Sequence, residues 1–170
     1  MDQLVPGLWT WTGRHPGWND DPHWGPDVRS YALVRGDHVL LFDPIDPPEQ
    51  LLVGRAAEIV LTATWHKRST PGLGLPVHDA GDPLPDGIDE RPAFYLPEER
   101  FLWLPERRAL VAGDSLPNAG EVPDAWLDVP REQYRKALRP LLELPIELLL
   151  PTHGDPIVED AHGHLARVLG

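Results

Sequence analysis

Four apolar segments of this sequence each end in polar residues of the kinds that bind metal ions or transfer protons. The polar residues that follow them are Asp43, then the group Trp65, His66, Lys67 and Arg68, then Asp114, and finally His153. Ionised carboxylates and neutral imidazoles both donate lone pairs to metal ions. Ligands of α/β proteins bind beyond the carboxyl ends of strands. These residues therefore predict a site built from the ends of several strands.

Alternating apolar patterns and turn residues predict the elements that position these side chains. Strands are expected at residues 7–13, 30–34, 38–42, 58–63, 100–104, 109–112 and 146–150. Helices are expected at residues 47–55, 131–144 and 159–169, the second kinked or shortened by Pro140. Residues 77–92 are expected to be irregular, and the residues around His66 to form a polar loop. Hairpins mixed with helices favour a layered α/β fold in which helices cover sheets.

Length, composition and charge limit the classes of protein to which the chain can belong. With 170 residues and no cysteine, we expect a single domain over residues 1–170 without disulfides or thiolate metal ligands. The net charge of −12 argues against binding to nucleic acids or anionic membranes, because phosphate groups would be repelled. No apolar run reaches the length of about 18 residues that a membrane span needs. The lack of cysteine favours a cytoplasmic location, and the N-terminus lacks the pattern of a signal peptide.

Four segments, taken in order, resemble the metallo-β-lactamase-fold superfamily. They are HVLLFDP at residues 38–44, EIVLTATWHKRS at residues 58–69, FLWLPERRALVAGDSL at residues 101–116 and LLLPTHGDPI at residues 148–157. In that family a Gly-Asp supplies a carboxylate that bridges two metals, and the resemblance places it at Asp114. A late metal-binding histidine falls on His153, before a glycine that would let a ligand approach closely. The resemblance implies a four-layer αββα sandwich with a hydrolytic metal site at its edge.

The metal-binding motif of this family, His-x-His-x-Asp-His, is degenerate in the sequence. Aligned without gaps after the strand EIVLTA, its four ligand positions carry Ala63, Trp65, Lys67 and Arg68. His66 stands one residue out of register. A second divalent cation would be repelled by Lys67 and Arg68. We therefore do not expect the usual two-metal site, in which the ions lie about 3.5–4 Å apart.

Two roles for the segment around His66 stay open, besides that of a surface loop. A single cation held by Asp114, His153 and His66 would keep an open coordination position, as a catalytic zinc does. Alternatively, the site would hold a small anion without catalysis, because fixed cations stabilise anionic groups. The candidates for contacts with such a ligand are Trp65, Lys67 and Arg68, and His15 would line the same crevice.

The Trp-rich segment GRHPGWNDDPHW, residues 13–24, contains two more histidines. In the resembled family the early loops overhang the site. His15 is therefore a candidate general base or missing metal ligand, since imidazole titrates near neutrality. It fits equally well as an exposed histidine of a lid, and this second reading is the one expected for His23.

The residues together predict a metallo-β-lactamase-fold protein with a degenerate metal site, a pseudoenzyme or atypical hydrolase. His66 and His15 are its catalytic candidates, and Asp114 and His153 are its candidate metal ligands. We expect either no cofactor or a single divalent metal, with zinc preferred. One alternative is a mononuclear-metal hydrolase of an ester, thioester or phosphoester. The other is a non-catalytic module that binds a small, possibly regulatory, anion.

Overall fold

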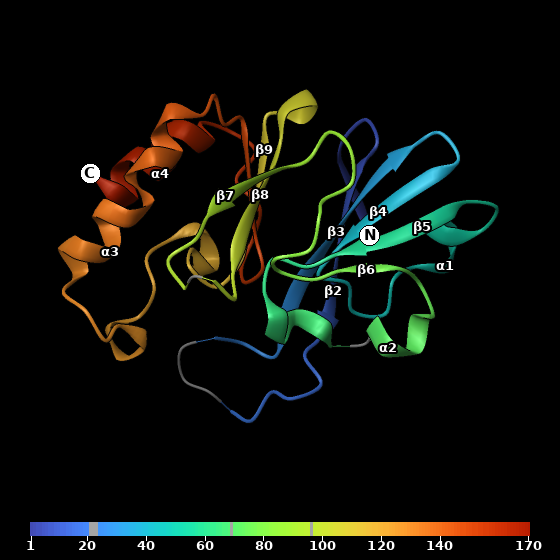
Figure 1. The fold of residues 1–170 in the computed structure, drawn as a ribbon, viewed down its shortest axis with the longest axis horizontal. Helices are drawn as coiled ribbons and strands as arrows, with labels where there is room; N and C mark the ends of the chain where they lie inside the picture. Colours follow the sequence, from blue (N-terminus) through green and yellow to red (C-terminus); the bar gives the residue numbers. More distant parts are fainter. Residues whose placement is uncertain (21–23, 69, 96) are drawn as a thin grey trace. The chain divides into compact units, whose positions relative to one another are not determined.

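The computed structural model describes residues 1–20, 24–68, 70–95 and 97–170, which form two compact units, residues 1–83 and 84–170. Each unit combines one sheet with short helices (Figure 1). Each also has a hydrophobic cluster formed by its own residues. The single domain expected for residues 1–170 stays a prediction.

The first unit is built on a six-stranded sheet whose strands lie in sequence order. The strands are β1 (Asp2–Val5), β2 (Leu8–Arg14), β3 (Asp27–Arg35), β4 (His38–Phe42), β5 (Ala56–Val60) and β6 (Val77–His78). Antiparallel pairing joins β1 to β2, β2 to β3 and β3 to β4, whereas β4, β5 and β6 run parallel. Because β4 and β5 are parallel, their carboxyl ends lie at the same edge of the sheet.

Two short helices supply the crossover connections that the parallel strands need. Helix α1 (Glu49–Leu52) connects β4 to β5, and a 3₁₀ turn (Thr64–Lys67) followed by α2 (Thr70–Leu73) connects β5 to β6. Leu51 of α1 is buried with Trp11, Leu41 and Ile59 of the sheet. Side chains alternate between the two faces of β2, and Trp11 lies on the face that packs against α1.

The second unit contains a four-stranded sheet in the order β10-β9-β8-β7. Its strands are β7 (Asp89–Pro92), β8 (Arg100–Leu104), β9 (Ala109–Ala112) and β10 (Leu148–Pro151). Strands β7, β8 and β9 pair antiparallel, and β10 pairs parallel with β9. All four residues of β9 and of β10 are buried, as expected for near-continuous apolar strands.

Helices α3 (Arg131–Leu138) and α4 (Ala161–Leu169) lie beside one another and contribute to the core of the second unit (Figure 1). Tyr134 and Leu138 of α3 and Leu165 of α4 are buried there. The effect expected of Pro140 is confirmed, because α3 ends at Leu138 and the chain continues as a 3₁₀ turn. The proline ring is incompatible with an uninterrupted α-helix.

Two expectations about the elements are corrected by the structure. Residues 77–92 are not wholly irregular, since they contain β6 and β7. Both are short edge strands, and β7 carries charged residues and a proline, which are weak strand signals. The segment after β5, expected to be a polar loop, forms the 3₁₀ turn and α2 instead. A 3₁₀ turn of this length leaves no apolar periodicity for a sequence to reveal.

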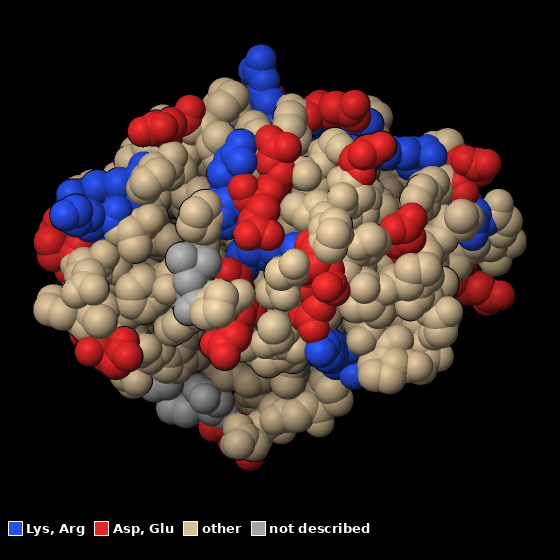
Figure 2. Space-filling view, in the orientation of Figure 1, with Lys and Arg blue, Asp and Glu red and all other residues tan. Residues whose placement is uncertain are grey.

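Charged side chains of both signs are distributed over the surface. Figure 2 shows Asp and Glu side chains spread across one face, with Lys and Arg side chains lying among them. In the described ranges, no helix has the length and the apolar character that crossing a membrane requires.

Candidate functional site

Asp43 and Thr62 meet where the parallel strands β4 and β5 end. Thr62 donates two hydrogen bonds to the Asp43 carboxylate, from its backbone N–H to Oδ1 (2.9 Å) and from its hydroxyl to Oδ2 (2.5 Å). The two residues are only 2% and 0% exposed. A buried carboxylate is tolerated when donors satisfy its lone pairs, and Thr62 does this from the neighbouring strand end.

His66 completes this group from the 3₁₀ turn that follows β5. Its Nδ1 lies 3.1 Å from Asp43 Oδ2 and 2.9 Å from Thr62 Oγ1. The turn brings His66 back over the strand end, and the His66 N–H donates to the carbonyl of Ala63 (3.0 Å). His66 is therefore no surface residue, since it is 2% exposed. We call Asp43, Thr62 and His66 the Asp43 cluster.

The environment of Asp43 favours its ionised form. Burial by itself would raise the pKa of the Asp43 carboxyl. The charge and hydrogen bond of His66, the charge of Arg68 and the Thr62 hydrogen bond outweigh this effect and hold the pKa below its ordinary value of 3.8. Asp43 is consequently a carboxylate at neutral pH.

Hydrogen bonds to the backbone fix the position of Asp43 further. Its carbonyl oxygen accepts from the Ser30 hydroxyl (2.8 Å) and from an Arg68 guanidinium N–H (3.2 Å). The backbone φ of Asp43 is +44°, in the left-handed region that Asp tolerates better than most residues. The Asp43 cluster is thus held from β3, β5 and the turn together.

The predicted ligand-contacting residues of the same turn lie in different environments. Trp65 is 43% exposed, and its ring meets that of His66 edge-on with centroids 6.0 Å apart. The ammonium of Lys67 lies 2.6 Å from Asp79 Oδ2, and Arg68 binds the backbone of Asp43. Both cations therefore have acceptors within the first unit, which weakens the attraction they would exert on an anion.

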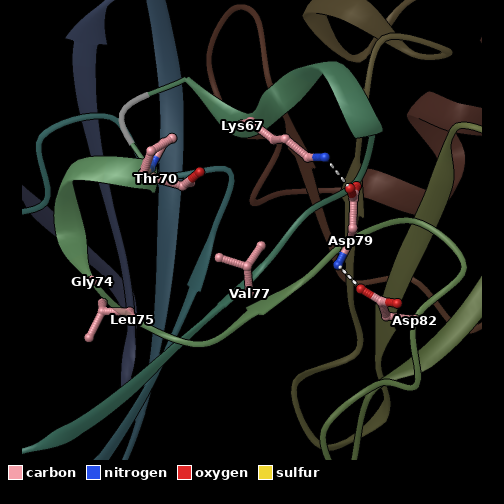
Figure 3. Close-up of a pocket in the computed structure, with 8 residues that line it drawn as sticks. Lys67, Thr70, Gly74, Leu75, Val77, Asp79 and Asp82 are labelled. Carbon is pink, nitrogen blue, oxygen red and sulfur yellow. Dashed lines mark hydrogen bonds and ion pairs between the residues drawn. The ribbon is translucent and has the colours of Figure 1, made fainter.

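Lys67 and Asp79 also border a cavity of about 390 Å³ in the first unit (Figure 3). Its other lining residues belong to α2, to β6 and to the chain on either side of β6. Figure 3 shows the Lys67 side chain extending towards Asp79, with Asp82 next to it. The cavity therefore combines charged groups of both signs with apolar side chains.

Asp114 and His153, the predicted metal ligands, come together within the second unit. They follow β9 and β10, which are parallel and paired as far as Ala112 and Pro151, so both leave the sheet at one edge. His153 Nε2 lies 3.5 Å from Asp114 Oδ1, and the two side chains are 9% and 20% exposed. The structure thus places these two residues together, and their role as metal ligands stays a prediction.

The turn that carries Asp114 is fixed by a buried glutamate. Glu99 is 1% exposed, and its two carboxylate oxygens accept from the Ser115 N–H (2.8 Å) and the Ser115 hydroxyl (2.5 Å). The Ser115 hydroxyl oxygen accepts from the N–H of Phe94 (2.9 Å), and the Ser115 carbonyl accepts from the Tyr134 hydroxyl (2.8 Å). These four hydrogen bonds hold the residue next to Asp114 in one position.

Gly154, directly after His153, allows a close approach by protein rather than by a ligand. Its φ is +80°, and a Cβ at this position would lie 2.7 Å from Asn118 Oδ1 and 3.0 Å from Asn118 Cα. Only a residue without a side chain fits both the backbone conformation and this contact. The glycine therefore serves the packing of the segment that contains His153.

His15 lies in the loop between β2 and β3. Its Nδ1 accepts a hydrogen bond from the N–H of Gly17 (3.1 Å), and its ring meets Trp24 edge-on with centroids 5.0 Å apart. Trp18 donates from its indole N–H to the carbonyl of Trp24 (3.2 Å). The Trp-rich loop is therefore packed partly on itself, and a catalytic role for His15 stays a prediction. His23 lies outside the described residues.

The residues present do not fit the two-metal centre that a metallo-β-lactamase fold implies. In the ungapped register expected from the resemblance, the four ligand positions carry Ala63, Trp65, Lys67 and Arg68, which offer neither a carboxylate nor an imidazole. Within the described ranges, no group of three or more His, Asp or Glu side chains could hold a metal ion. His66 belongs to the first unit and Asp114 and His153 to the second, so a cation shared by all three stays a prediction.

Sequence reasoning did not identify Thr62 or Glu99 as parts of these groups, and it placed Ser115 beside Asp114 after the strand ALVA without giving it a role. The sequence contains one indication of a role for Thr62, because it is a polar residue within the apolar segment EIVLTA. Glu99 directly precedes the apolar strand RFLWL, but it binds Ser115, 16 positions further along the chain. A single sequence does not reveal such a pairing, because charged residues at strand ends are usually solvated.

The structure is similar to solved structures of metallo-β-lactamases over nearly its whole length. A metallo-β-lactamase from Erythrobacter litoralis is 14% identical with a TM-score of 0.64, covering 99% of this chain and 94% of that one. A metallo-β-lactamase family protein from Thermus thermophilus is 18% identical with a TM-score of 0.62, covering 98% and 79%. For TMB-1 the identity is 11%, the TM-score 0.67 and the coverage 99% and 95%.

No protein-family model matches the sequence, and no curated protein matches it. The structural similarity nevertheless shows that the chain has the metallo-β-lactamase fold. The fold class expected from the sequence, an α/β fold of the αββα type, is confirmed.

Proposed function

We propose that this chain is a metallo-β-lactamase-fold protein that has lost two-metal hydrolysis and acts as a pseudoenzyme. The observation that supports this best is the position of His66, which is buried against Asp43 and Thr62. Turning its imidazole outwards to a metal would leave the Asp43 carboxylate in the core without this partner, which costs several kcal/mol.

The two residues after His66 act in the same direction. In the ungapped register expected from the resemblance, Lys67 and Arg68 stand at the positions of a carboxylate and an imidazole. Both side chains are protonated and have no lone pair to donate to a metal ion. A metal activates a bound water in such hydrolases, and among the described residues of the first unit no group of three or more His, Asp or Glu side chains could hold that metal. The Asp43 cluster is instead structural, since it joins the ends of β4 and β5 to the turn between β5 and α2.

Metal analysis of protein without an affinity tag tests this proposal. The protein is incubated with excess zinc, freed of unbound metal by gel filtration and assayed for zinc and for hydrolysis of ester, thioester and phosphoester substrates. We expect far less than stoichiometric zinc and no hydrolysis above the buffer rate. Asp114→Ala and His153→Ala should leave the metal content unchanged, and so should the control His162→Ala, an exposed residue of α4.

A mononuclear-metal hydrolase is the second candidate, and one distance favours it. Asp114 Oδ1 and His153 Nε2 are 3.5 Å apart, close to the separation of neighbouring ligands around one zinc ion. Stoichiometric zinc that is lost in Asp114→Ala and His153→Ala, but kept in His162→Ala, would establish this candidate and refute the pseudoenzyme. Turnover that depends on added zinc would do the same.

A further inference from the structure

The cavity beside Lys67 has a lining suited to a small organic ligand. Its volume of about 390 Å³ falls at the lower end of the range of about 300–1,000 Å³ that is typical of small-molecule sites. Charged and polar side chains form part of its wall, namely Lys67, Thr70, Asp79 and Asp82 (Figure 3). We propose that this cavity binds a small organic ammonium ion that carries a short apolar chain.

The charges of the wall favour a cation over an anion. Lys67 Nζ lies 2.6 Å from Asp79 Oδ2, so these two charges largely compensate each other. Asp82 Oδ2 accepts the backbone N–H of Asp79 (2.9 Å), which places a second carboxylate beside the pair. The charged side chains of the wall are one cation, Lys67, and two carboxylates, Asp79 and Asp82, so their formal charges attract an ammonium ion. An anion would have to displace Asp79 from Lys67 next to Asp82. The net charge of −12 attracts cations to the chain as a whole.

Thr70 adds a polar group with little exposure to water to this wall. It lines the cavity and is 4% exposed. A threonine hydroxyl has one hydrogen to donate and two lone pairs that accept, so it can accept an N–H from a ligand while it donates its own hydrogen elsewhere. An ammonium head group carries several such N–H donors, which Thr70 and the two carboxylates of the wall can share.

The remaining wall suits an alkyl chain. Leu75 and Val77 line the cavity, and Val77 is 39% exposed although it lies in strand β6. Covering such apolar surface is favourable in proportion to the area removed from water. A ligand with an ammonium head and a short hydrocarbon chain therefore matches both parts of the lining.

An NMR titration with three probes of equal length tests this proposal. Hexylammonium, hexan-1-ol and hexanoate are titrated separately into the ¹⁵N-labelled full chain at neutral pH, with EDTA present so that metal ions do not contribute. We expect hexylammonium to bind saturably and to shift the amide signals of residues 70–82. It should bind about tenfold tighter than the alcohol or the carboxylate, because hydrogen bonds between charged groups are the strong ones.

Three variants test which charged side chains of the cavity determine its preference for a cation. Asp82→Asn should weaken hexylammonium binding by about tenfold, and Lys67→Met should strengthen it, because the competing cation of the wall is removed. Asp37→Asn removes one negative charge, as Asp82→Asn does, but in an exposed turn between β3 and β4. It should leave the affinity for hexylammonium unchanged. If Asp82→Asn fails to fold, Lys67→Met still decides the outcome.

Four results would overturn the proposal. They are the absence of saturable binding by hexylammonium, equal affinities for all three probes, unchanged affinity in Lys67→Met, and tighter binding of hexanoate than of hexylammonium. The last of these would support the small-anion site expected from the sequence.

Discussion

The Nδ1 atom of His66 lies 3.1 Å from Oδ2 of Asp43, and both side chains are almost completely buried. This contact joins the end of β4 to the turn after β5, with Thr62 bonded to both partners. The resemblance to the metallo-β-lactamase family predicts metal ligands in this region of the chain. Here the histidine is part of the packed interior, so its loss should affect stability before it affects any chemistry.

Replacing Asp43 should destabilise the protein strongly. In Asp43→Ala the donors of Thr62 and His66 lose their buried acceptor, and we expect the free energy of unfolding to fall by about 3 kcal/mol. Urea denaturation monitored by circular dichroism measures this change. Asp37→Asn, in an exposed turn, serves as the control and should change the free energy by less than about 0.5 kcal/mol. A loss in Asp43→Ala no larger than that of the control would contradict the structural role.

Acidification should remove the contribution of Asp43 to stability. The pKa of Asp43 is lowered in the folded state, so near its ordinary value of 3.8 the unfolded chain binds more protons than the folded one. The stabilisation is therefore fully present above that value and is lost as the pH falls through the lower folded pKa. The difference in free energy of unfolding between wild type and Asp43→Asn should accordingly shrink when the pH is lowered from neutral to about pH 2. A difference that stays constant over this range would show that the carboxylate is not stabilised by folding.

Truncating His66 should lower stability by a smaller amount. His66→Ala removes one partner of Asp43 but leaves both hydrogen bonds from Thr62, so we expect a loss of about 2 kcal/mol. Thermal and urea unfolding measure it, with His162→Ala as the exposed control on α4. If His66 were a surface residue, both variants would unfold at the same denaturant concentration.

Glu99 offers a test of the turn that carries Asp114. In Glu99→Gln the side-chain amide has one oxygen in place of two acceptors, so either the N–H or the hydroxyl of Ser115 loses its bond. We expect a loss of about 1–3 kcal/mol in the free energy of unfolding. The neighbouring variant Glu98→Gln makes the same chemical change at an exposed residue and should be nearly neutral. Equal effects of the two substitutions would argue against the buried contact.

A comparison of Gly154→Ala with Gly36→Ala separates the cost of a steric contact from the cost of backbone strain. Gly154→Ala combines a φ of +80° with a Cβ only 3.0 Å from Asn118 Cα, whereas Gly36→Ala has a φ of +62° and open space around it. Gly36→Ala should cost about 1 kcal/mol from strain alone, and Gly154→Ala should cost about 1–3 kcal/mol more because the backbone of Asn118 must shift. Equal losses of stability in the two variants would show that Asn118 does not pack closely against Gly154.

Most elements of the fold could be predicted because their patterns are local. The alternation of Trp9 and Trp11 with threonines predicted β2, and the apolar run HVLLF predicted β4. The effect of Pro140 on the helix after Arg131 follows from the geometry of one residue. The short strands β6 and β7 were missed, because their pairing partners, not their own residue preferences, hold them in the sheet.

For the candidate site, the sequence by itself determined which side chains are present near the end of β5. Ala63, Trp65, Lys67 and Arg68 are neither carboxylates nor imidazoles in any conformation, and that they stand at the family's ligand positions stays a prediction. Only the tertiary structure decided where the remaining polar groups point. The burial of His66 against Asp43 depends on a 3₁₀ turn and on the ends of two parallel strands. Asp43 and Thr62, which follow these strands, are 19 positions apart in the sequence. Such contacts arise from packing between distant segments, which residue order alone does not specify.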